Sequence, residues 1–121
     1  MKVPQAIRFA VLERENGHCL RCRRSLSNVP ASVHHRKPRG MGGTSDDRCN
    51  DMRNLITLCG DGVQGCHGWI ESRRTTARED GWLIRSYDDL DRPLRRPDGS
   101  SVRLFSDGGV ISWRTDELGV E

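Results

Sequence analysis

The sequence has no long hydrophobic run and few aromatic residues. No apolar stretch approaches the roughly 20 residues of a membrane-spanning helix, and Met1 is not followed by the apolar segment of a signal peptide. Aromatic side chains make up 5% of the chain, and hydrophobic residues account for 34% against 31% charged. Internal repeats and low-complexity segments are also missing. We therefore expect a cytoplasmic protein with no membrane partner and only a thin apolar core.

The length of the chain sets a second limit. At 121 residues it is expected to form one small domain. Small domains with thin cores often recruit a metal ion or disulfides, and five cysteines are available here. Because thiols stay reduced inside cells, these cysteines are expected to hold metal instead of forming disulfides.

Lysine is scarce, and the basic charge is unevenly spread. Of the 20 basic residues 18 are arginine; residues 1–40 carry nine basic against two acidic side chains (+7), and residues 41–121 carry eleven against fifteen (−4). Arginine can grip a phosphate through two hydrogen bonds, so a basic first part of the chain suits a polyanion such as DNA. An ordinary solvated surface explains the same charge, and charge alone does not separate the two.

Hydrophobic periodicity predicts the order of the elements. Ile7, Ala10 and Val11 predict a helix over residues 4–16, which Gly17 ends. A CxxC turn, a short strand, a Gly-rich loop, a second short strand and a second helix are expected next, at 19–22, 33–35, 39–51, 54–58 and 66–80. Further strands are expected at 82–87, 102–105 and 110–113. The fold class is therefore α+β, with residues 82–121 as a small β appendage of the same domain.

Four of the cysteines form two pairs. Cys19 and Cys22 are a CxxC pair, and Cys59 and Cys66 are a second pair with six residues between them. Four thiolates in two pairs fit a tetrahedral structural Zn²⁺, and three glycines inside the second pair would let its loop fold back. Cysteines that are simply buried apolar groups are the alternative. Cys49 is expected to be a free thiol, unless it replaces one of the four.

Three of the four histidines fall between Val33 and Glu71. Adjacent strand residues point to opposite faces, so His34 and His35 are expected to do different jobs: one can bind a metal while the other takes a proton. On the predicted second helix, His67 and Glu71 lie one turn apart and share a face. A carboxylate on a solvated helix face remains the alternative for Glu71.

These motifs resemble the HNH endonuclease family. The segments that carry the likeness are the knuckle at Cys19 and Cys22, Val33-His34-His35, the Gly42-Gly43 loop, Asn54-Leu55-Ile56-Thr57-Leu58-Cys59, and Cys66-His67. The resemblance covers residues 5–80 and implies a ββα-metal core, two short strands and a helix, within residues 1–81, with an N-terminal helix and a structural zinc knuckle. The family usually reads Leu-Cys-x-x-Cys-His, whereas this chain has four more residues between the two cysteines.

Matched position by position, the resemblance implies that His35 is the general base and that Asn54 holds the loop between the strands and so positions it. His34 and His67 match ligands of a catalytic divalent ion such as Mg²⁺, Mn²⁺ or Zn²⁺. Glu71 stands where some family members supply another ligand. The four paired cysteines match the structural Zn²⁺ ligands of the zinc-containing branch.

The activity that the resemblance implies is metal-dependent cleavage of DNA to 5′-phosphate and 3′-hydroxyl ends. The chain is also similar to small HNH proteins that tailed phages encode near their packaging genes, which makes a phage terminase a candidate partner. Basic side chains beside both motifs are expected to contact the DNA backbone with little sequence preference. They are Arg21, Arg23, Arg24, Arg36, Lys37 and Arg39.

Two other functions fit parts of the pattern. A non-catalytic zinc ribbon that binds DNA or protein would need the cysteines but not the histidines. A restriction-like or homing nuclease would need its own recognition module, for which residues 82–121 are short and acidic.

Overall fold

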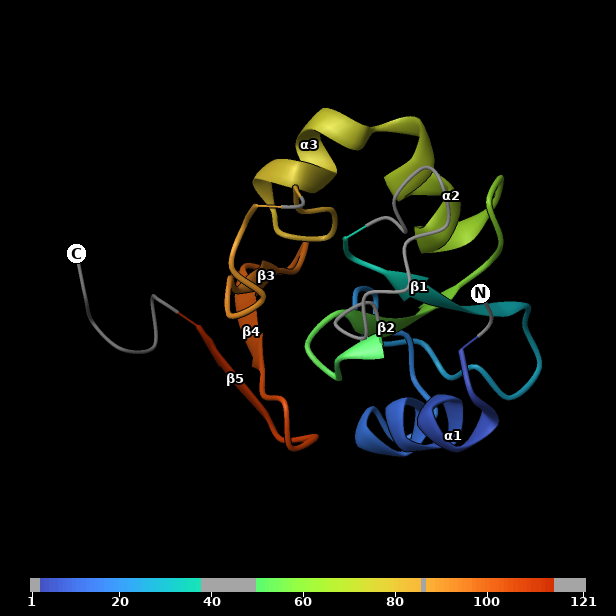
Figure 1. Cartoon of the computed structure of the whole chain (residues 1–121). Coiled ribbons are helices and arrows are strands. Elements are labelled where there is room, and N and C mark those ends of the chain that lie inside the picture. The colour runs from blue at the N-terminus through green and yellow to red at the C-terminus, as the bar shows by residue number, and fades with distance from the viewer. Residues whose placement is uncertain (1–2, 38–49, 86, 115–121) are drawn as a thin grey trace, which may run out of the picture.

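Two short antiparallel strands stand at the centre of the computed structural model, which describes residues 3–37, 50–85 and 87–114 (Figure 1). β1 (Ala31–His35) pairs with β2 (Leu55–Cys59) in a register that sets His34 opposite Ile56. All five residues of β2 are buried, as its apolar and β-branched composition favours. Both predicted strands of the hairpin are therefore present, within two residues of their predicted bounds.

Helices cover the hairpin on two sides. α1 (Gln5–Arg14) lies below it and α2 (Gly65–Ser72) above it in Figure 1, and both contact β2. Just past α1, the carboxylate of Glu15 accepts hydrogen bonds from the backbone N–H and the hydroxyl of Thr57. This buried polar link fixes the predicted N-terminal helix against β2.

The second predicted helix is broken into two. The sequence predicts one helix over residues 66–80, but α2 ends at Ser72 and α3 (Arg74–Glu79) follows. Arg73 between them has φ −127° and ψ 57°, outside the helical region. The carbonyl of Trp69 accepts both the backbone N–H of Arg73 and the Ser72 hydroxyl, so α2 makes its last helical bond just before the break. The chain therefore turns a corner at Arg73.

None of the helices in the described residues is long and apolar enough to cross a membrane.

The strand expected at 82–87 is absent from the described part of that segment. Trp82, Leu83 and Ile84 are all buried, so their side chains do not alternate between a core and solvent. The backbone N–H of Ile84 donates to the carbonyl of Arg36, which follows β1. The prediction is wrong because the hydrogen bonds of this segment go to α3, to the loop after β1 and to side chains, not to a neighbouring strand.

A second antiparallel sheet forms near the C-terminus. Its strand order is β3 (Leu94–Arg95), β4 (Ser100–Leu104) and β5 (Val110–Arg114), of which the sequence predicts the last two. The apolar side chains of this sheet join those of β2, α2 and α3 in one cluster. Its members include Leu20, Ile56, Leu58, Ile70, Ala77, Trp82, Leu94, Val102 and Leu104. The chain is thus a small mixed α/β protein in which both sheets contribute to the same core.

Arg36 ties the segment after α3 to the hairpin. Its side chain is 0% exposed and donates four hydrogen bonds to backbone carbonyls. The acceptors are Arg53, Gly81, Leu90 and Arg92, at 2.6 to 3.1 Å. Burial lowers the pKa of Arg36 to about 9, which leaves the guanidinium charged at neutral pH. The expectation that Arg36 contacts DNA is wrong, because its side chain has no surface in contact with solvent.

Replacing Arg36 with methionine is expected to lower the free energy of unfolding by at least about 3 kcal/mol, because each buried carbonyl that loses its donor costs about 1–3 kcal/mol. The measurement is urea unfolding of the zinc-loaded protein. Arg8→Met removes an exposed arginine from α1 and is the matched control, with an expected change within about 0.5 kcal/mol. Equal midpoints for the two variants would contradict the role given to Arg36.

Candidate metal centres

Four cysteine sulfurs converge between the knuckle, the end of β2 and the start of α2. The Sγ atoms of Cys19, Cys22, Cys59 and Cys66 all lie within 4.8 Å of one another, and Cys22 Sγ is 3.7 Å from Cys59 Sγ. A tetrahedral site with Zn–S bonds near 2.3 Å places its sulfurs about 3.8 Å apart. The backbone N–H of Cys22 points to Cys19 Sγ, and that of Cys66 to Cys59 Sγ. The donors and their spacing fit one structural metal ion such as zinc.

Close packing and burial shift the pKa values of the Cys19, Cys22 and Cys66 thiols. The hydrogen bond between Cys19 and Cys66 lowers the pKa of Cys19 to about 4 and raises the pKa of Cys66. Burial raises the pKa of Cys22. Since metal binding requires thiolates, loading this site releases protons and depends on pH.

A tight loop joins Cys59 to Cys66. Gly60 and Gly65 both have positive φ, +88° and +66°, and a Cβ on them would lie 2.0 Å and 2.6 Å from backbone oxygens across the loop. The side chain of Asp61 accepts hydrogen bonds from two backbone N–H groups further along it. The loop folds back as its glycines predict, so the six-residue spacing still brings both sulfurs to one cluster.

Arg21 lies beside this sulfur cluster. One of its N–H groups is 3.3 Å from Cys66 Sγ, and its guanidinium carbon lies 3.8 Å from the ring centroid of Trp69. A cation held here by the aromatic face offsets negative charge on the thiolates. Arg23 and Arg24 of the same knuckle are exposed, so they are better placed than Arg21 to meet a polyanion.

A second group of metal-binding side chains gathers His34 from β1 with His67 and Glu71 from α2. One ligand atom from each lies within 4.8 Å of the other two. The imidazole centroids are 5.4 Å apart, and Glu71 Oε2 is 3.7 Å from His67 Nε2. The predicted shared helix face of His67 and Glu71 is present, and β1 brings His34 to it.

In His34 and in His67, one ring nitrogen makes a hydrogen bond, which leaves the other ring nitrogen free to bind a metal. His34 Nε2 lies 3.0 Å from the carbonyl of Trp82, which can only accept, so Nε2 carries the hydrogen. The Ser32 hydroxyl donates to the carbonyl of Gly60, so its oxygen accepts from His67 Nδ1 at 3.0 Å. The lone pairs therefore lie on His34 Nδ1 and His67 Nε2. Carbonyl and hydroxyl partners of this kind orient histidine ligands in metal sites.

Burial makes His34 suited to bind a cation as a neutral ligand. The residue is 5% exposed, and desolvation lowers the pKa of His34 to about 4. It is therefore unprotonated at neutral pH, as a histidine must be to ligate a metal.

His35 lies at the same pocket, half-buried, with Nε2 3.4 Å from Asn50 Oδ1. Asn54 is fully buried just before β2, and its side-chain oxygen accepts the backbone N–H of Lys37 at 2.7 Å. Its own carbonyl accepts the backbone N–H of Arg36. Asn54 thus clamps the chain directly after His35.

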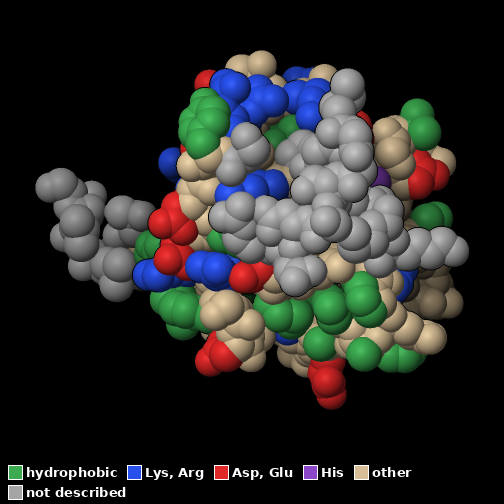
Figure 2. Space-filling view, viewed as in Figure 1, with side chains coloured by type: hydrophobic (Ala, Val, Ile, Leu, Met, Phe, Trp, Pro, Cys, Tyr) green, Lys and Arg blue, Asp and Glu red, His purple; other side chains and the backbone are tan. Residues whose placement is uncertain are grey.

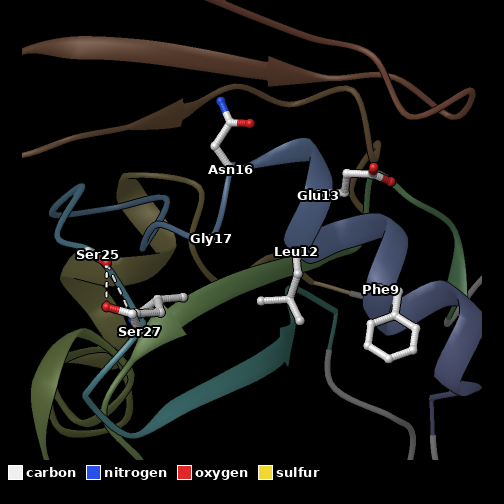
Figure 3. Close-up of a pocket in the computed structure, with 8 residues that line it drawn as sticks. Phe9, Leu12, Glu13, Asn16, Gly17, Ser25 and Ser27 are labelled. Atoms are coloured by element: carbon white, nitrogen blue, oxygen red, sulfur yellow. Dashed lines mark hydrogen bonds between the residues drawn. The ribbon is translucent and has the colours of Figure 1, made fainter.

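The pocket that holds these histidines has a volume of about 350 Å³. It is lined by Val33, His34, His35, His67, Glu71, Arg74 and Leu83. A larger cavity of about 770 Å³ lies along α1, and its lining includes Phe9 and Leu12 of that helix and the mutually hydrogen-bonded hydroxyls of Ser25 and Ser27 (Figure 3). Among the described residues, Glu13 is the only titratable one that lines it. Convergent ligand chemistry therefore distinguishes the smaller pocket.

Two contributors to this pocket do not come out of the sequence analysis: Ser32 and the carbonyl of Trp82. Ser32 had a usable signal, because it lies two residues before His34 and so shares its face of the strand. The carbonyl of Trp82 had none, since every residue carries one. The predicted residues Arg39 and Cys49 lie outside the described part of the chain.

A comparison of the chain with protein-family models, curated proteins and solved structures finds no match. The function has to be inferred from the residues and their geometry.

We expect the purified protein to carry one zinc ion per chain at the sulfur cluster. Loss of a residue that hydrogen-bonds to a metal ligand typically lowers metal affinity by about 10–100-fold. Cys22→Ser should weaken zinc binding by more than this, because it removes a ligand itself. Competition with a chromogenic chelator measures this. Cys49→Ser is the control and should bind zinc like the wild type; a Cys22→Ser protein with wild-type affinity would exclude the four-sulfur site.

Ser32→Ala should lower the affinity of the histidine pocket for Mn²⁺ by about 10–100-fold, because His67 loses the acceptor that orients it. Electron paramagnetic resonance of zinc-loaded protein titrated with Mn²⁺ reports this affinity, and zinc content should not change. Ser27→Ala, at an exposed serine, is the matched control. Equal Mn²⁺ affinities in the two variants would show that the Ser32 bond does not orient a ligand.

Proposed function

We propose that this chain is a metal-dependent DNA endonuclease of the HNH type, with a catalytic divalent ion bound by His34, His67 and Glu71. The observation that carries the proposal is the convergence of these three ligands beside a third imidazole, His35. A purely structural protein has no need for three histidines at one pocket, two of them with a ring nitrogen within 4.8 Å of one another.

The order of the elements supports the same proposal. β1 carries His34 and His35, β2 follows Asn54, and α2 carries His67 and Glu71. This is the strand, strand, helix order of the ββα-metal motif that the sequence resembles. The sulfur cluster fits the structural zinc of the zinc-containing branch, because four protein sulfurs leave no coordination position for substrate.

Each side chain then has a separate part in phosphodiester hydrolysis. A bound divalent ion would neutralise charge on the phosphate and on the leaving 3′ oxygen. His35 would take the proton of the attacking water, as a neutral imidazole can near pH 7. Asn54 would keep His35 in place through its hold on the backbone after Arg36.

A non-catalytic zinc module remains the second candidate, and one observation favours it. Glu71 forms an ion pair with Arg74 at 2.9 Å and lies close to His67, a chain of contacts that an ordinary helix surface also makes. Such a module would bind DNA or protein without cleaving DNA, so an activity measurement separates the two.

His35→Ala is expected to keep its zinc and its fold and to lose about 10²–10⁴-fold in cleavage rate, the usual contribution of a general base. Nicking of supercoiled plasmid in Mg²⁺ or Mn²⁺ measures the rate. His18→Ala changes the one histidine outside the motif and should cleave like the wild type. Wild-type nicking by His35→Ala would remove His35 from the mechanism, and no metal-stimulated nicking by the wild type would favour the zinc module.

A further inference from the structure

A second cavity borders the histidine pocket at the corner between α2 and α3. It has a volume of about 510 Å³ and is lined by Ser72, Arg73, Arg74, Thr75 and Thr76. We call it the corner cleft. Its lining residues have guanidinium and hydroxyl groups but no carboxylate, so its side chains suit an anion.

Arg74 belongs to both cavities, since it also lines the histidine pocket. One N–H group of its guanidinium donates to Glu71 Oε1, and the side chain is 45% exposed. Within the described residues its other N–H groups make no hydrogen bond. Arg74 is therefore held at one edge by Glu71 and can donate from the other edge to a ligand that passes from one cavity to the next.

Arg73 supplies the second charge of the corner cleft. It is exposed, and within residues 3–37, 50–85 and 87–114 it forms no ion pair. The backbone of Arg73 is not helical, so α2 ends before this residue and α3 begins after it. The break places Arg73 at the corner where two helices meet.

The side chains that line the corner cleft are basic or neutral, and the nearby Glu71 carboxylate is paired with Arg74. Residues 73–78 include three arginines and no acidic residue. Lys and Arg side chains gather at the top of the molecule over α3 in Figure 2. A planar guanidinium matches the oxygens of a phosphate, and adjacent hydroxyls can add hydrogen bonds.

We propose that the corner cleft binds a backbone phosphate of the DNA strand close to the phosphate that is cleaved, with Arg73 as its main contact and Arg74 between the two positions. This inference rests on the proposed endonuclease function, because it takes the histidine pocket as the place of cleavage. It moves the expected DNA path away from Arg36 and toward the α2–α3 corner.

The first test is the salt dependence of binding to a fluorescent 20-base-pair duplex, measured by anisotropy on zinc-loaded protein without added Mg²⁺ or Mn²⁺. Each lost phosphate contact lowers the slope of log K against log salt by about 0.9. Arg73→Gln should show this decrease and bind several-fold more weakly, while Arg73→Lys should recover the slope. Arg8→Gln loses the same charge from α1, at the opposite end of the molecule in Figure 1, and should leave the slope unchanged.

The second test locates the contact. Once the cut made by the wild type has been mapped, single neutral methylphosphonates are placed at each of the phosphates that flank it. At one position the substitution should slow the wild type and Arg8→Gln but add nothing to the defect of Arg73→Gln. Effects that add at every position, or equal salt slopes for Arg73→Gln and Arg8→Gln, would overturn the proposal.

The two tests separate this inference from the proposed function. A wild type that binds the duplex with the expected Arg73 dependence but never cleaves it refutes the endonuclease and supports phosphate binding at the corner cleft. A wild type that cleaves normally alongside an equally active Arg73→Gln with an unchanged salt slope refutes the corner cleft alone.

Discussion

The convergence of four cysteine sulfurs is the constraint on which the other parts of this small protein depend. It joins the knuckle after α1 to the end of β2 and to the first turn of α2, segments that are 47 residues apart at its two extremes, Cys19 and Cys66. Closing so long a loop is entropically costly, and a cross-link among residues that are otherwise held by a thin core offsets that cost. His67 directly follows Cys66, so the sulfur cluster also fixes the position of the histidine pocket.

The two ligand groups are also joined by hydrogen bonds. Gly60, in the loop that closes the second cysteine pair, accepts the hydroxyl of Ser32, and that oxygen accepts from His67. From the other side, His34 is held by the carbonyl of Trp82. Each histidine is thus oriented by a segment remote from its own element, which explains how short strands and one eight-residue helix can hold a defined site.

The sequence indicates the ligand chemistry of the site better than it indicates the structure of the segments around the site. Thiols and imidazoles are rare and their roles are few, so the two ligand groups could be predicted from residue type and order, and both come together in space. The hairpin and the first helix follow from periodicity. The break at Arg73 depends on one non-helical backbone conformation, which its residue type does not indicate. The irregular path of residues 82–85 depends on hydrogen bonds to α3, to the loop after β1 and to side chains, which hydrophobic periodicity does not indicate either. Arg36 was wrongly predicted to contact DNA. Nothing in the pattern of charges shows that this arginine is buried against four carbonyl acceptors.

The Arg36 contacts have an evolutionary consequence, because only the donor of each hydrogen bond is a side chain. All four acceptors are main-chain carbonyls, which no side-chain substitution at Leu90 or Arg92 can delete. Sequence drift in the segment after α3 is therefore compatible with these bonds as long as the path of the backbone is kept, whereas a change at position 36 removes all of them at once. Among related chains, this predicts an invariant arginine facing a segment whose length is kept but whose residues vary.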